Sequence, residues 1–477
     1  MRELAGSPPS FRDPDGYLYS VGHRLLRYVS ADAAADAREF LGCTLALDWM
    51  QQSKLVRSFI VQNPAGVDLP PECATLPEGA AIVEHTPLAF RNYPYEWPPG
   101  MLLAAANLTV ELARGSLRAG FVLKDATPYN VIFDGCRPVF VDLLSFRRRD
   151  PREAVWQPYG QFVRTFVLPL LANRYFGLRT DEMLMAHRDG IEPERLWAMA
   201  PAYRLWFAPF LSTVTLPVLL GGRERRGGAE QYRVRHARDE QEARFLLERL
   251  FARIDRLLGR LAKRRRASQA LRYMDSDHPY SDEEFARKET FVSAALERYS
   301  PRTVLDVGCN TGHFSRLAAR AGARVVAIDR DEAAIDSIWR SANETGPAIL
   351  PLVVDIGRPP GACGWQNAEC PAFLDRARGR FDCVLMLALI HHLLVNERVP
   401  LGAILHLASE LTTNLAIVEY IAPEDHNFRK IARGRDALHR DLSVENFESA
   451  ASHWFEIAGA AQVNPTRRIY LLQKKGS

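Results

Sequence analysis

The amino-acid sequence predicts an α/β fold class, with a doubly wound parallel sheet in its C-terminal part and an α+β domain before it. From Thr303 onward, short apolar runs alternate with helical stretches, which is the pattern of a parallel sheet covered on both faces. The first 222 residues mix short β-like runs with helices instead. A strongly basic helical segment separates the two patterns. We therefore expect domains at 1–222 and 273–477, joined by a helical linker over 223–272.

The C-terminal pattern begins with a helix and ends with a hairpin. Ser281 and Glu284 have the spacing of a capping box, which opens a helix that Ser300-Pro301 ends. We then expect strands at 303–307, 324–328, 349–354, 381–387 and 415–419, with helices beginning near 312, 331, 371 and 401. The runs 454–457 and 468–472 have no long crossover helix between them, so they predict a terminal antiparallel hairpin.

The N-terminal pattern is less regular. The runs 17–19 and 25–29 flank Gly22 and predict a β-hairpin. Residues 101–114 read as a helix, and 122–123 and 139–141 read as short strands around a loop.

The composition excludes several classes of protein. Charged residues make up 25% of the 477 and hydrophobic residues 47%, which is ordinary for globular proteins and excludes a disordered, collagen-like or disulfide-scaffold chain. The seven cysteines are scattered, and no C-x-x-C occurs, which favours reduced thiols. No secretory signal is visible near Met1, and the longest apolar run, 205–220, is too short to span a bilayer. We expect a cytoplasmic protein without a transmembrane segment.

The basic segment 223–266 explains the net charge of the chain. It holds 15 Lys and Arg against 7 Asp and Glu, a net +8, so the whole-chain value of +4 leaves a net −4 elsewhere. Its apolar residues recur at helical spacing between arginines. The segment is interpreted as an inter-domain helix or as a peripheral contact with an anionic membrane. No interleaved aromatic residues favour a specific nucleic-acid partner.

A glycine turn after the first predicted strand of the C-terminal sheet indicates a nucleotide-like ligand. Val304-Leu305-Asp306-Val307-Gly308 runs into a turn that reaches Gly312 and opens a helix. Asp329 ends the next strand, where a carboxylate can accept both hydroxyls of a ribose. The spacing is G-x-x-x-G, and Asp306 before the turn suits a positive amino group better than phosphates. S-adenosylmethionine, with its ribose and aminocarboxylate, is such a ligand.

These residues resemble the first motif and the ribose-binding acid of class I S-adenosylmethionine-dependent methyltransferases, over roughly 273–475. The resemblance implies a Rossmann-like, seven-stranded methyltransferase sheet. It also implies that the cofactor is bound by Asp306, Gly308, Asn310, Gly312, Asp329, Asp355 and Leu387. Asn310 stands where the family often has glycine, and asparagine tolerates a positive φ better than most residues.

Three further sequence blocks narrow the resemblance to a smaller group of methyltransferases. They are Gly364–Asn367, Ala388–Leu393 and Glu419–Asp425. With the N-terminal half, they resemble the bacterial nodulation-protein-like methyltransferases that have a kinase-like N-terminal region. That resemblance implies methyl transfer but leaves the acceptor open. A small molecule, a glycan, a natural product and a peptide all remain candidates.

Two histidines and a glutamate are the candidate catalytic residues. His391 and His392 lie just past the fourth parallel strand, at the edge where open α/β sheets bind ligands. A histidine near neutral pKa can take the proton of a hydroxyl acceptor. Glu419 ends the fifth strand and is a second candidate for orienting the acceptor. The alternative is that the histidines cap a helix or pack on the cofactor ring.

The N-terminal half carries a second short pattern. Asp125 and Asn130 are five residues apart, and Asp142 follows an apolar strand. This resembles the catalytic loop and metal-binding aspartate of protein-kinase-like phosphotransferases, which would make Asp125 the base and Asn130 and Asp142 magnesium ligands. However, Leu-Lys-Asp replaces His-Arg-Asp, and no G-x-G-x-x-G precedes it. A kinase-like domain used for binding and an active Mg-ATP site are both left open.

The sequence therefore favours an S-adenosylmethionine-dependent O-methyltransferase whose N-terminal domain presents the acceptor. One alternative is a bifunctional protein that also transfers phosphate from Mg-ATP. Another is a module that binds the cofactor without turnover.

Overall fold

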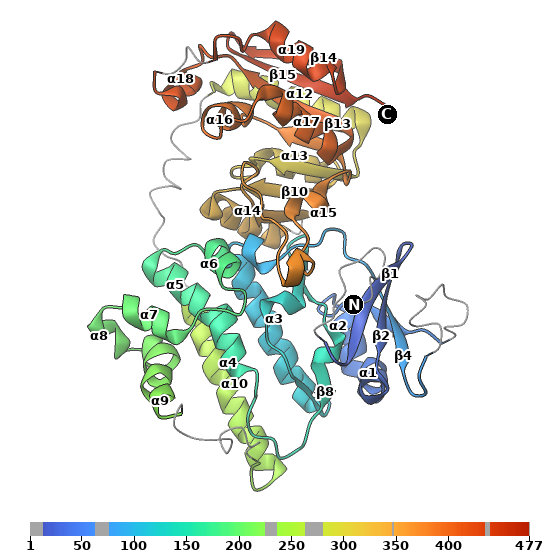
Figure 1. The fold of residues 1–477 in the computed structure, drawn as a ribbon, viewed down its shortest axis with the longest axis vertical. Coiled ribbons are helices and arrows are strands. Elements are labelled where there is room, and N and C mark those ends of the chain that lie inside the picture. Colours follow the sequence, from blue (N-terminus) through green and yellow to red (C-terminus); the bar gives the residue numbers. More distant parts are fainter. Residues whose placement is uncertain are drawn as a thin grey trace. The chain divides into compact units, whose positions relative to one another are not determined.

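The computed structural model describes residues 13–62, 76–224, 236–262, 280–345, 348–434 and 439–476. It divides into two compact units, one of residues 1–265 with 364–370 and one of residues 266–363 with 371–477. Figure 1 shows the elements of both units. The middle and end of the predicted basic segment, 225–235 and 263–266, and the expected start of the methyltransferase-like part at Tyr273 lie outside the described residues.

The C-terminal unit is built on a seven-stranded sheet with the order β11-β10-β9-β12-β13-β15-β14. Its strands are β9 (Thr303–Val307), β10 (Arg324–Asp329), β11 (Ile349–Val353), β12 (Phe381–Met386), β13 (Thr412–Ile421), β14 (Phe455–Asn464) and β15 (Arg467–Lys474). The first five pair in parallel, and β15 pairs antiparallel with both β13 and β14. The predicted doubly wound sheet with a terminal hairpin is confirmed.

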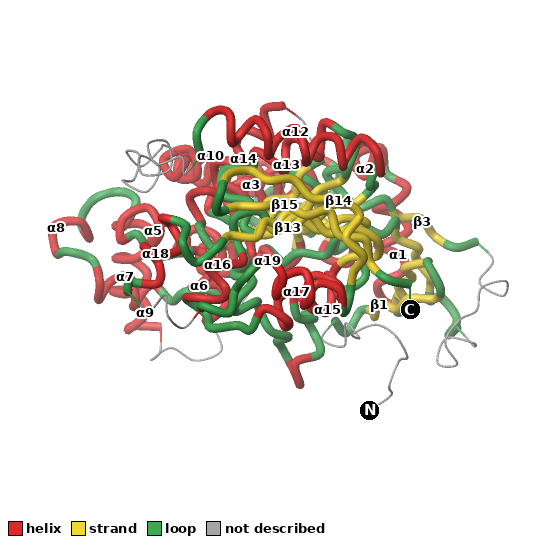
Figure 2. The backbone as a smooth tube through the Cα atoms, turned by 90° about the horizontal axis from the view of Figure 1, so that it is seen from above, coloured by secondary structure: helices red, strands yellow, loops and turns green. Residues whose placement is uncertain are grey.

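Helices cover both faces of this sheet. They are α12 (Asp282–Tyr299), α13 (His313–Arg320), α14 (Glu332–Thr345), α15 (Phe373–Ala377), α16 (Ile390–Val395), α17 (Leu401–Leu411), α18 (His426–Ala432) and α19 (Val444–Ser452). Figure 2 shows α12 and α13 on one side of the strands and α17 and α19 on the other. The predicted capping box is present, because Ser281 Oγ accepts a hydrogen bond from the Glu284 amide and Glu284 accepts one from the Ser281 amide.

The N-terminal unit begins with a four-stranded antiparallel sheet in the order β1-β2-β4-β3. Its strands are β1 (Gly16–Val21), β2 (Arg24–Val29), β3 (Ser58–Ile60) and β4 (Ala81–His85), with α1 (Ala31–Gly42) and α2 (Thr44–Gln51) between β2 and β3. The hairpin predicted around Gly22 is present, and Gly22 has the positive φ of 58° that its tight turn requires.

The rest of the N-terminal unit is mostly helical. The elements are α3 (Pro99–Arg118), β5 (Phe121–Leu123), β6 (Val131–Asp134), β7 (Arg137–Phe140), β8 (Phe146–Arg148), α4 (Tyr159–Phe162), α5 (Leu168–Phe176), α6 (Thr180–Ala186), α7 (Pro193–Met199), α8 (Ala202–Leu205), the π-helix η7 (Leu211–Thr215), α9 (Leu216–Glu224) and α10 (Glu240–Ala262). Short antiparallel pairs join β5 to β8 and β6 to β7.

The predicted basic amphipathic helix is α10, and it packs within the N-terminal unit. Phe251 lies 5.3 Å from Trp156 between ring centroids, and Arg114 on α3 forms an ion pair with Asp255 at 2.6 Å. The apolar stripe of α10, which includes Leu247 and Ile254, is buried. Where we expected a linker, this helix completes the core of the unit because its apolar stripe is covered by α3 and its neighbours.

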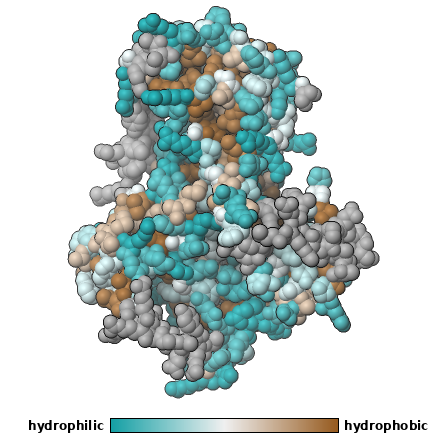
Figure 3. Space-filling view, viewed as in Figure 1, coloured by the Kyte–Doolittle hydropathy of each residue, from teal (hydrophilic) through white to brown (hydrophobic). Residues whose placement is uncertain are grey.

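Residues Gly364–Cys370 also group with the N-terminal unit, although they lie between β11 and β12 in the chain. Arg188 donates to Glu369 at 3.0 Å and to Cys370 Sγ at 3.3 Å. Figure 3 shows hydrophilic side chains over much of the visible face, with apolar side chains gathered in a few places.

Candidate functional site

The turn after β9 depends on three residues with positive φ. Gly308, Asn310 and Gly312 have φ values of 73°, 51° and 78°. The Gly308 amide donates to the Ile328 carbonyl at 2.8 Å, which ties the turn to β10. A Cβ added at Gly312 would lie 2.9 Å from the Ile338 side chain. Glycine is therefore required there both for the left-handed backbone and for packing within the protein. Asn310 adopts the positive φ that the sequence allowed.

Asp329 is held at the end of β10 by two backbone amides. Its Oδ2 accepts from the Asn310 amide and its Oδ1 from the Asp331 amide, both at 2.9 Å. Burial raises the pKa of its carboxyl, and the two amide bonds oppose that increase. Each carboxylate oxygen has two acceptor sites, so Asp329 keeps capacity for further donors such as ribose hydroxyls.

Asp306 is a buried acid under the same turn. Its Oδ2 accepts a hydrogen bond from Ser315 Oγ at 2.6 Å. Burial raises the pKa of Asp306 to about 6, an effect that the Ser315 bond opposes and nearby Asp329 increases. A desolvated carboxylate of this kind is stabilised by a cationic group beside it. The chemistry of Asp306 therefore fits a ligand with an ammonium group.

Asp355 and Leu387 follow β11 and β12. Asp355 Oδ1 accepts from the Gly357 amide at 2.9 Å, and the Leu387 side chain is buried. Because β9, β10, β11 and β12 are parallel neighbours, their carboxyl ends meet at one edge of the sheet. The fold therefore brings the acids that follow β10 and β11 to the same edge as the glycine turn.

A buried ionic network lies beside β13, and the sequence indicated only part of it. Lys288 Nζ on α12 donates to Glu419 Oε2 at 2.6 Å and to Tyr280 Oη at 3.2 Å. Tyr280 Oη in turn donates to Glu419 Oε1 at 2.7 Å. Lys288 is 2% exposed and Glu419 is fully buried. Burial lowers the pKa of Lys288, and the neighbouring Glu419 opposes that decrease.

Arg467 on β15 extends this network and had no sequence motif to reveal it. It donates to Tyr280 Oη at 2.6 Å and forms a bidentate pair with Asp425 at 2.8 and 2.9 Å. Burial raises the pKa of Asp425, but the hydrogen bonds and charge of Arg467, together with the hydrogen bonds from Thr466 and the Asn427 amide, bring it below its usual value. Arg467 meets Tyr280 only because β15 returns antiparallel to β13, so neighbouring residues in the sequence do not predict the contact.

His391 and His392 lie on α16, directly after β12, as the sequence predicted. Their rings are 4.3 Å apart between centroids. His391 is 4% exposed, and its Nδ1 has no hydrogen-bond partner among the described residues. Burial and the charges of His392 and Arg467 hold the pKa of His391 well below its usual value. His391 is therefore a neutral imidazole at neutral pH, with an unpaired buried nitrogen.

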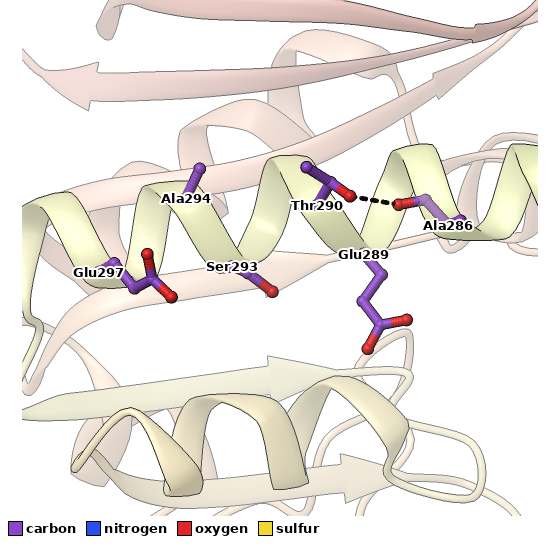
Figure 4. Close-up of a pocket in the computed structure, with 6 residues that line it drawn as sticks. All are labelled: Ala286, Glu289, Thr290, Ser293, Ala294 and Glu297. Carbon is purple, nitrogen blue, oxygen red and sulfur yellow. Dashed lines mark hydrogen bonds between the residues drawn. The ribbon is translucent and has the colours of Figure 1, made fainter.

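An open hollow of about 430 Å³ lies along one face of α12. Figure 4 shows its lining residues, and the Glu289 and Glu297 carboxylates extend from the helix into it. None of the residues proposed for cofactor binding or catalysis lines this hollow. It is therefore separate from the candidate site at the carboxyl edge of the sheet.

The residues of the kinase-like pattern in the N-terminal unit are linked through Ser145. Asn130 Nδ2 donates to Ser145 Oγ at 3.1 Å, and Ser145 Oγ donates to Asp142 Oδ2 at 2.5 Å. The other oxygen of Asp142 accepts from Arg27 at 3.0 Å. Burial and the charge of Asp142 raise the pKa of Asp125. The structure thus joins Asn130 to Asp142, while both oxygens of Asp142 already have partners.

His85 on β4, which the sequence did not indicate, interacts electrostatically with Arg27 and Asp142. Ser58 Oγ lies 3.0 Å from the Val56 carbonyl, to which it can donate, and 2.8 Å from His85 Nδ1, with which it shares a hydrogen bond. The His85 Nε2 atom has no hydrogen-bond partner in the described part of the chain. Burial, with the charge of Arg27, lowers the pKa of His85 to about 3. Among the described residues, no group of three or more His, Cys, Asp or Glu is arranged to hold a metal ion.

The strand order, the glycine turn and the strand-end acids together define the class of protein. A family model described as a methyltransferase domain matches residues 243–452. The C-terminal unit therefore has the fold of the class I S-adenosylmethionine-dependent methyltransferases.

Along nearly its whole length, the chain resembles the nodulation protein NoeA of Rhizobium meliloti (strain 1021). The two are 29% identical over 475 residues, which cover 98% of this chain and 95% of that protein. The resemblance therefore includes the N-terminal unit as well as the methyltransferase domain.

Solved structures give weaker similarities. The magnesium protoporphyrin IX methyltransferase ChlM from Synechocystis PCC 6803, with bound SAH, is 18% identical with a TM-score of 0.30, over 40% of this chain and 84% of that one. The bifunctional kinase-methyltransferase WbdD is 21% identical with a TM-score of 0.29, over 42% of this chain and 41% of that one. Neither TM-score is high enough to support an argument about this protein.

Proposed function

We propose that the protein transfers a methyl group from S-adenosylmethionine to an oxygen atom of a small-molecule, saccharide or natural-product acceptor. The bound cofactor supplies an activated methyl group on a sulfonium. The protein then has to align the acceptor, exclude water and receive the acceptor's proton. The observation that carries this proposal is the neutral, buried His391 beside the carboxyl edge of the methyltransferase sheet.

We assign the cofactor contacts by their chemistry. Asp329 would accept hydrogen bonds from the ribose hydroxyls of the cofactor, and Asp306 would face its amino group. Asp355 and Leu387 would lie against the adenine, with the backbone of Gly308, Asn310 and Gly312 forming the turn beneath the cofactor. Each oxygen of Asp329 accepts one hydrogen bond within the protein and can accept another, which supports its role toward the ribose. The raised pKa of Asp306 supports its role toward the amino group.

The Asp306 assignment predicts that cofactor affinity depends on pH. Its pKa is raised to about 6, so the carboxyl is ionised at pH 7 and protonated at pH 5. A positive amino group binds the ionised form better. We therefore expect S-adenosylmethionine to bind about tenfold more weakly at pH 5 than at pH 7 by isothermal titration calorimetry.

The control for this prediction is Asp306→Asn, which should bind weakly at both pH values. Lys288 and Asp329 act electrostatically on Asp306. S-adenosylmethionine binding to Lys288→Met should therefore be measured at the same two pH values, because this variant removes the charge of Lys288. Equal wild-type affinity at pH 5 and pH 7 would exclude an ionised Asp306 as the partner of the amino group.

His391 is the proposed base, and Glu419 is given a different role from the one the sequence suggested. Glu419 is fully buried, with Oε2 bonded to Lys288 and Oε1 to Tyr280, and this burial argues against direct contact with an acceptor. We assign Glu419 to positioning those two side chains. His391 instead is neutral and has a buried nitrogen with which no described residue pairs, so this nitrogen is available to the acceptor hydroxyl, although the burial that lowers the pKa of His391 also makes it a weaker base than an exposed histidine.

Replacing His391 with alanine is expected to lower kcat by about 10²- to 10⁴-fold, which is the usual contribution of general-base catalysis. The acceptor is first found by incubating the protein with methyl-labelled S-adenosylmethionine and a metabolite extract. His392→Ala is the matched control, since His392 Nδ1 lies 3.3 Å from Asn396 Nδ2 and its pKa is lowered less far. Cofactor affinity should be unchanged in both variants. Retained turnover in His391→Ala would rule out this base.

We further propose that the N-terminal unit positions the acceptor and does not transfer phosphate. Arg27 forms an ion pair with one oxygen of Asp142 and Ser145 donates to the other, and the positive charge of Arg27 opposes a magnesium ion at that carboxylate. The alternative of an active Mg-ATP site is favoured by the Asn130–Ser145–Asp142 chain. Calorimetry with Mg-ATP separates the two: binding that Asp142→Ala abolishes would support the phosphotransferase, and no binding would support acceptor positioning.

A further inference from the structure

Helix α16, which carries the proposed base His391, is held at its beginning by the glycine turn. Leu389, the residue before the helix, packs so closely on the turn that a Cβ added to Gly308 would lie 3.0 Å from its side chain. Ala388 has a positive φ of 56°, which is uncommon for a residue other than glycine. Strained backbone of this kind persists only where the surrounding structure enforces it. The chain therefore enters α16 through a tightly constrained turn.

The other end of α16 packs on α18. Val395, the last residue of α16, forms a buried apolar cluster with Ile421, Phe428 and Ala432. Phe428 and Ala432 belong to α18, and both are fully buried. Because α16 has only six residues, its position depends on packing more than on its own hydrogen bonds. The position of His391 therefore depends on how α18 is held.

Helix α18 is held at its N-terminus by Asp425, and Asp425 is held by Arg467. Asp425 Oδ1 caps the helix by accepting from the amides of Asn427 at 2.9 Å and Phe428 at 3.4 Å. Arg467 donates to both oxygens of this carboxylate, at 2.8 and 2.9 Å, and Thr466 Oγ1 donates to it at 2.9 Å. Arg467 is 2% exposed, so its bidentate pair with Asp425 is shielded from water. This pair fixes the start of α18.

The charges that act on the His391 ring come from several elements around it. They are His392 on α16, Arg467 on β15, Asp425 before α18 and Lys288 on α12. Glu419 on β13, a strand that α16 also contacts, is paired with Lys288. Burial, His392, Arg467 and Lys288 lower the pKa of His391, and Asp425 opposes them. Without Arg467, the unpaired carboxylate of Asp425 would favour the protonated imidazole.

We propose that Arg467 is a positioning residue for His391. Through Asp425 it fixes α18, on which α16 packs, and its charge keeps the imidazole in the neutral form that can receive a proton. This inference rests on the proposed role of His391 as the base. Arg467 is buried and acts through other residues, so it is not assigned a contact with the cofactor or the acceptor.

Histidine NMR of the full-length protein tests the inference without an acceptor. The His391 signals of the isotope-labelled protein are assigned by their loss in His391→Gln. In the wild type we expect no titration of this ring between about pH 5.5 and pH 8, because it stays neutral. In Arg467→Met we expect it to titrate within that range, because a cation is lost and Asp425 is left unpaired. Arg467→Lys keeps the charge and should leave the ring neutral.

Arg468→Met is the matched control, since Arg468 is the next residue on β15 and pairs with Glu448 at 3.5 Å instead. It should leave His391 as in the wild type. His392 is an internal control in each variant, because the charge that acts on it is that of Arg330. Circular dichroism checks that the variants are folded. If Arg467→Met does not fold, Arg467→Gln removes the charge while keeping a donor for Asp425.

Three outcomes would overturn the inference. One is a folded Arg467→Met or Arg467→Gln in which His391 does not titrate in this range. Another is an equal effect of Arg468→Met. The third is an equal shift of His391 and His392, which would indicate a general loosening of α16 without a specific effect on the base.

Turnover gives a second readout once the acceptor is known. The kcat of Arg467→Met should fall at least about threefold from pH 8 to pH 6, because His391 takes up a proton, whereas the wild-type kcat should change little. Retained turnover in His391→Ala would reject the proposed base, while the NMR titration would still measure the effect of Arg467 on the ring. The two failures are therefore distinguishable.

Discussion

Replacing Asp329 with alanine is expected to weaken S-adenosylmethionine binding by about 100-fold or more. A hydrogen bond to a charged group contributes ~1.5–3 kcal/mol, and the carboxylate is proposed to accept two from the ribose. The variant also loses the bonds that the amides of Asn310 and Asp331 donate to this carboxylate. The turn that faces the cofactor is therefore less well ordered. Isothermal titration calorimetry measures the effect directly.

Two further variants test whether the lost carboxylate oxygens of Asp329 cause the weaker binding. Asp329→Asn keeps one acceptor oxygen and should lie between the wild type and the alanine variant. Asp336→Ala is the matched control, since that acid lies on α14 and pairs with Arg340 at 2.7 Å at the surface. Asp336→Ala should bind the cofactor normally. Wild-type affinity in Asp329→Ala would show that ribose recognition lies elsewhere.

Replacing Lys288 with methionine is expected to destabilise the methyltransferase unit by about 3–5 kcal/mol. The change leaves the fully buried Glu419 without its closest cation, and an uncompensated buried charge is costly. For a unit of about 200 residues this corresponds to a decrease in Tm of roughly 10 °C. Thermal unfolding followed by circular dichroism measures it.

The controls test whether the buried pair is the cause. Lys288→Met/Glu419→Leu removes both charges, and it should recover much of the lost stability because apolar residues can replace a buried pair at little cost. Arg378→Met removes a surface partner of Glu410, and it should change the free energy of unfolding by less than about 1 kcal/mol. An equal loss in Arg378→Met and Lys288→Met would contradict this account.

The fold of the methyltransferase unit could be predicted well from local sequence. Alternating apolar runs and helices indicated the parallel strands, and the run pair near the C-terminus indicated the hairpin. The periods of strands and helices differ, so hydrophobic patterning separates them. The role of α10 could not be predicted in this way. Its amphipathic pattern shows that one face is covered, but not which part of the chain covers it.

The sequence by itself determined the glycine turn, the strand-end acids and the position of the histidines after β12, because each depends on residues close together in the chain. The tertiary structure decided the partners of buried charges. Glu419 pairs with Lys288 across 131 residues, Arg467 reaches Tyr280 across 187, and Arg27 reaches Asp142 across 115. A charged side chain that leaves water must find a partner, and the packing of distant strands and helices determines which partner is within reach.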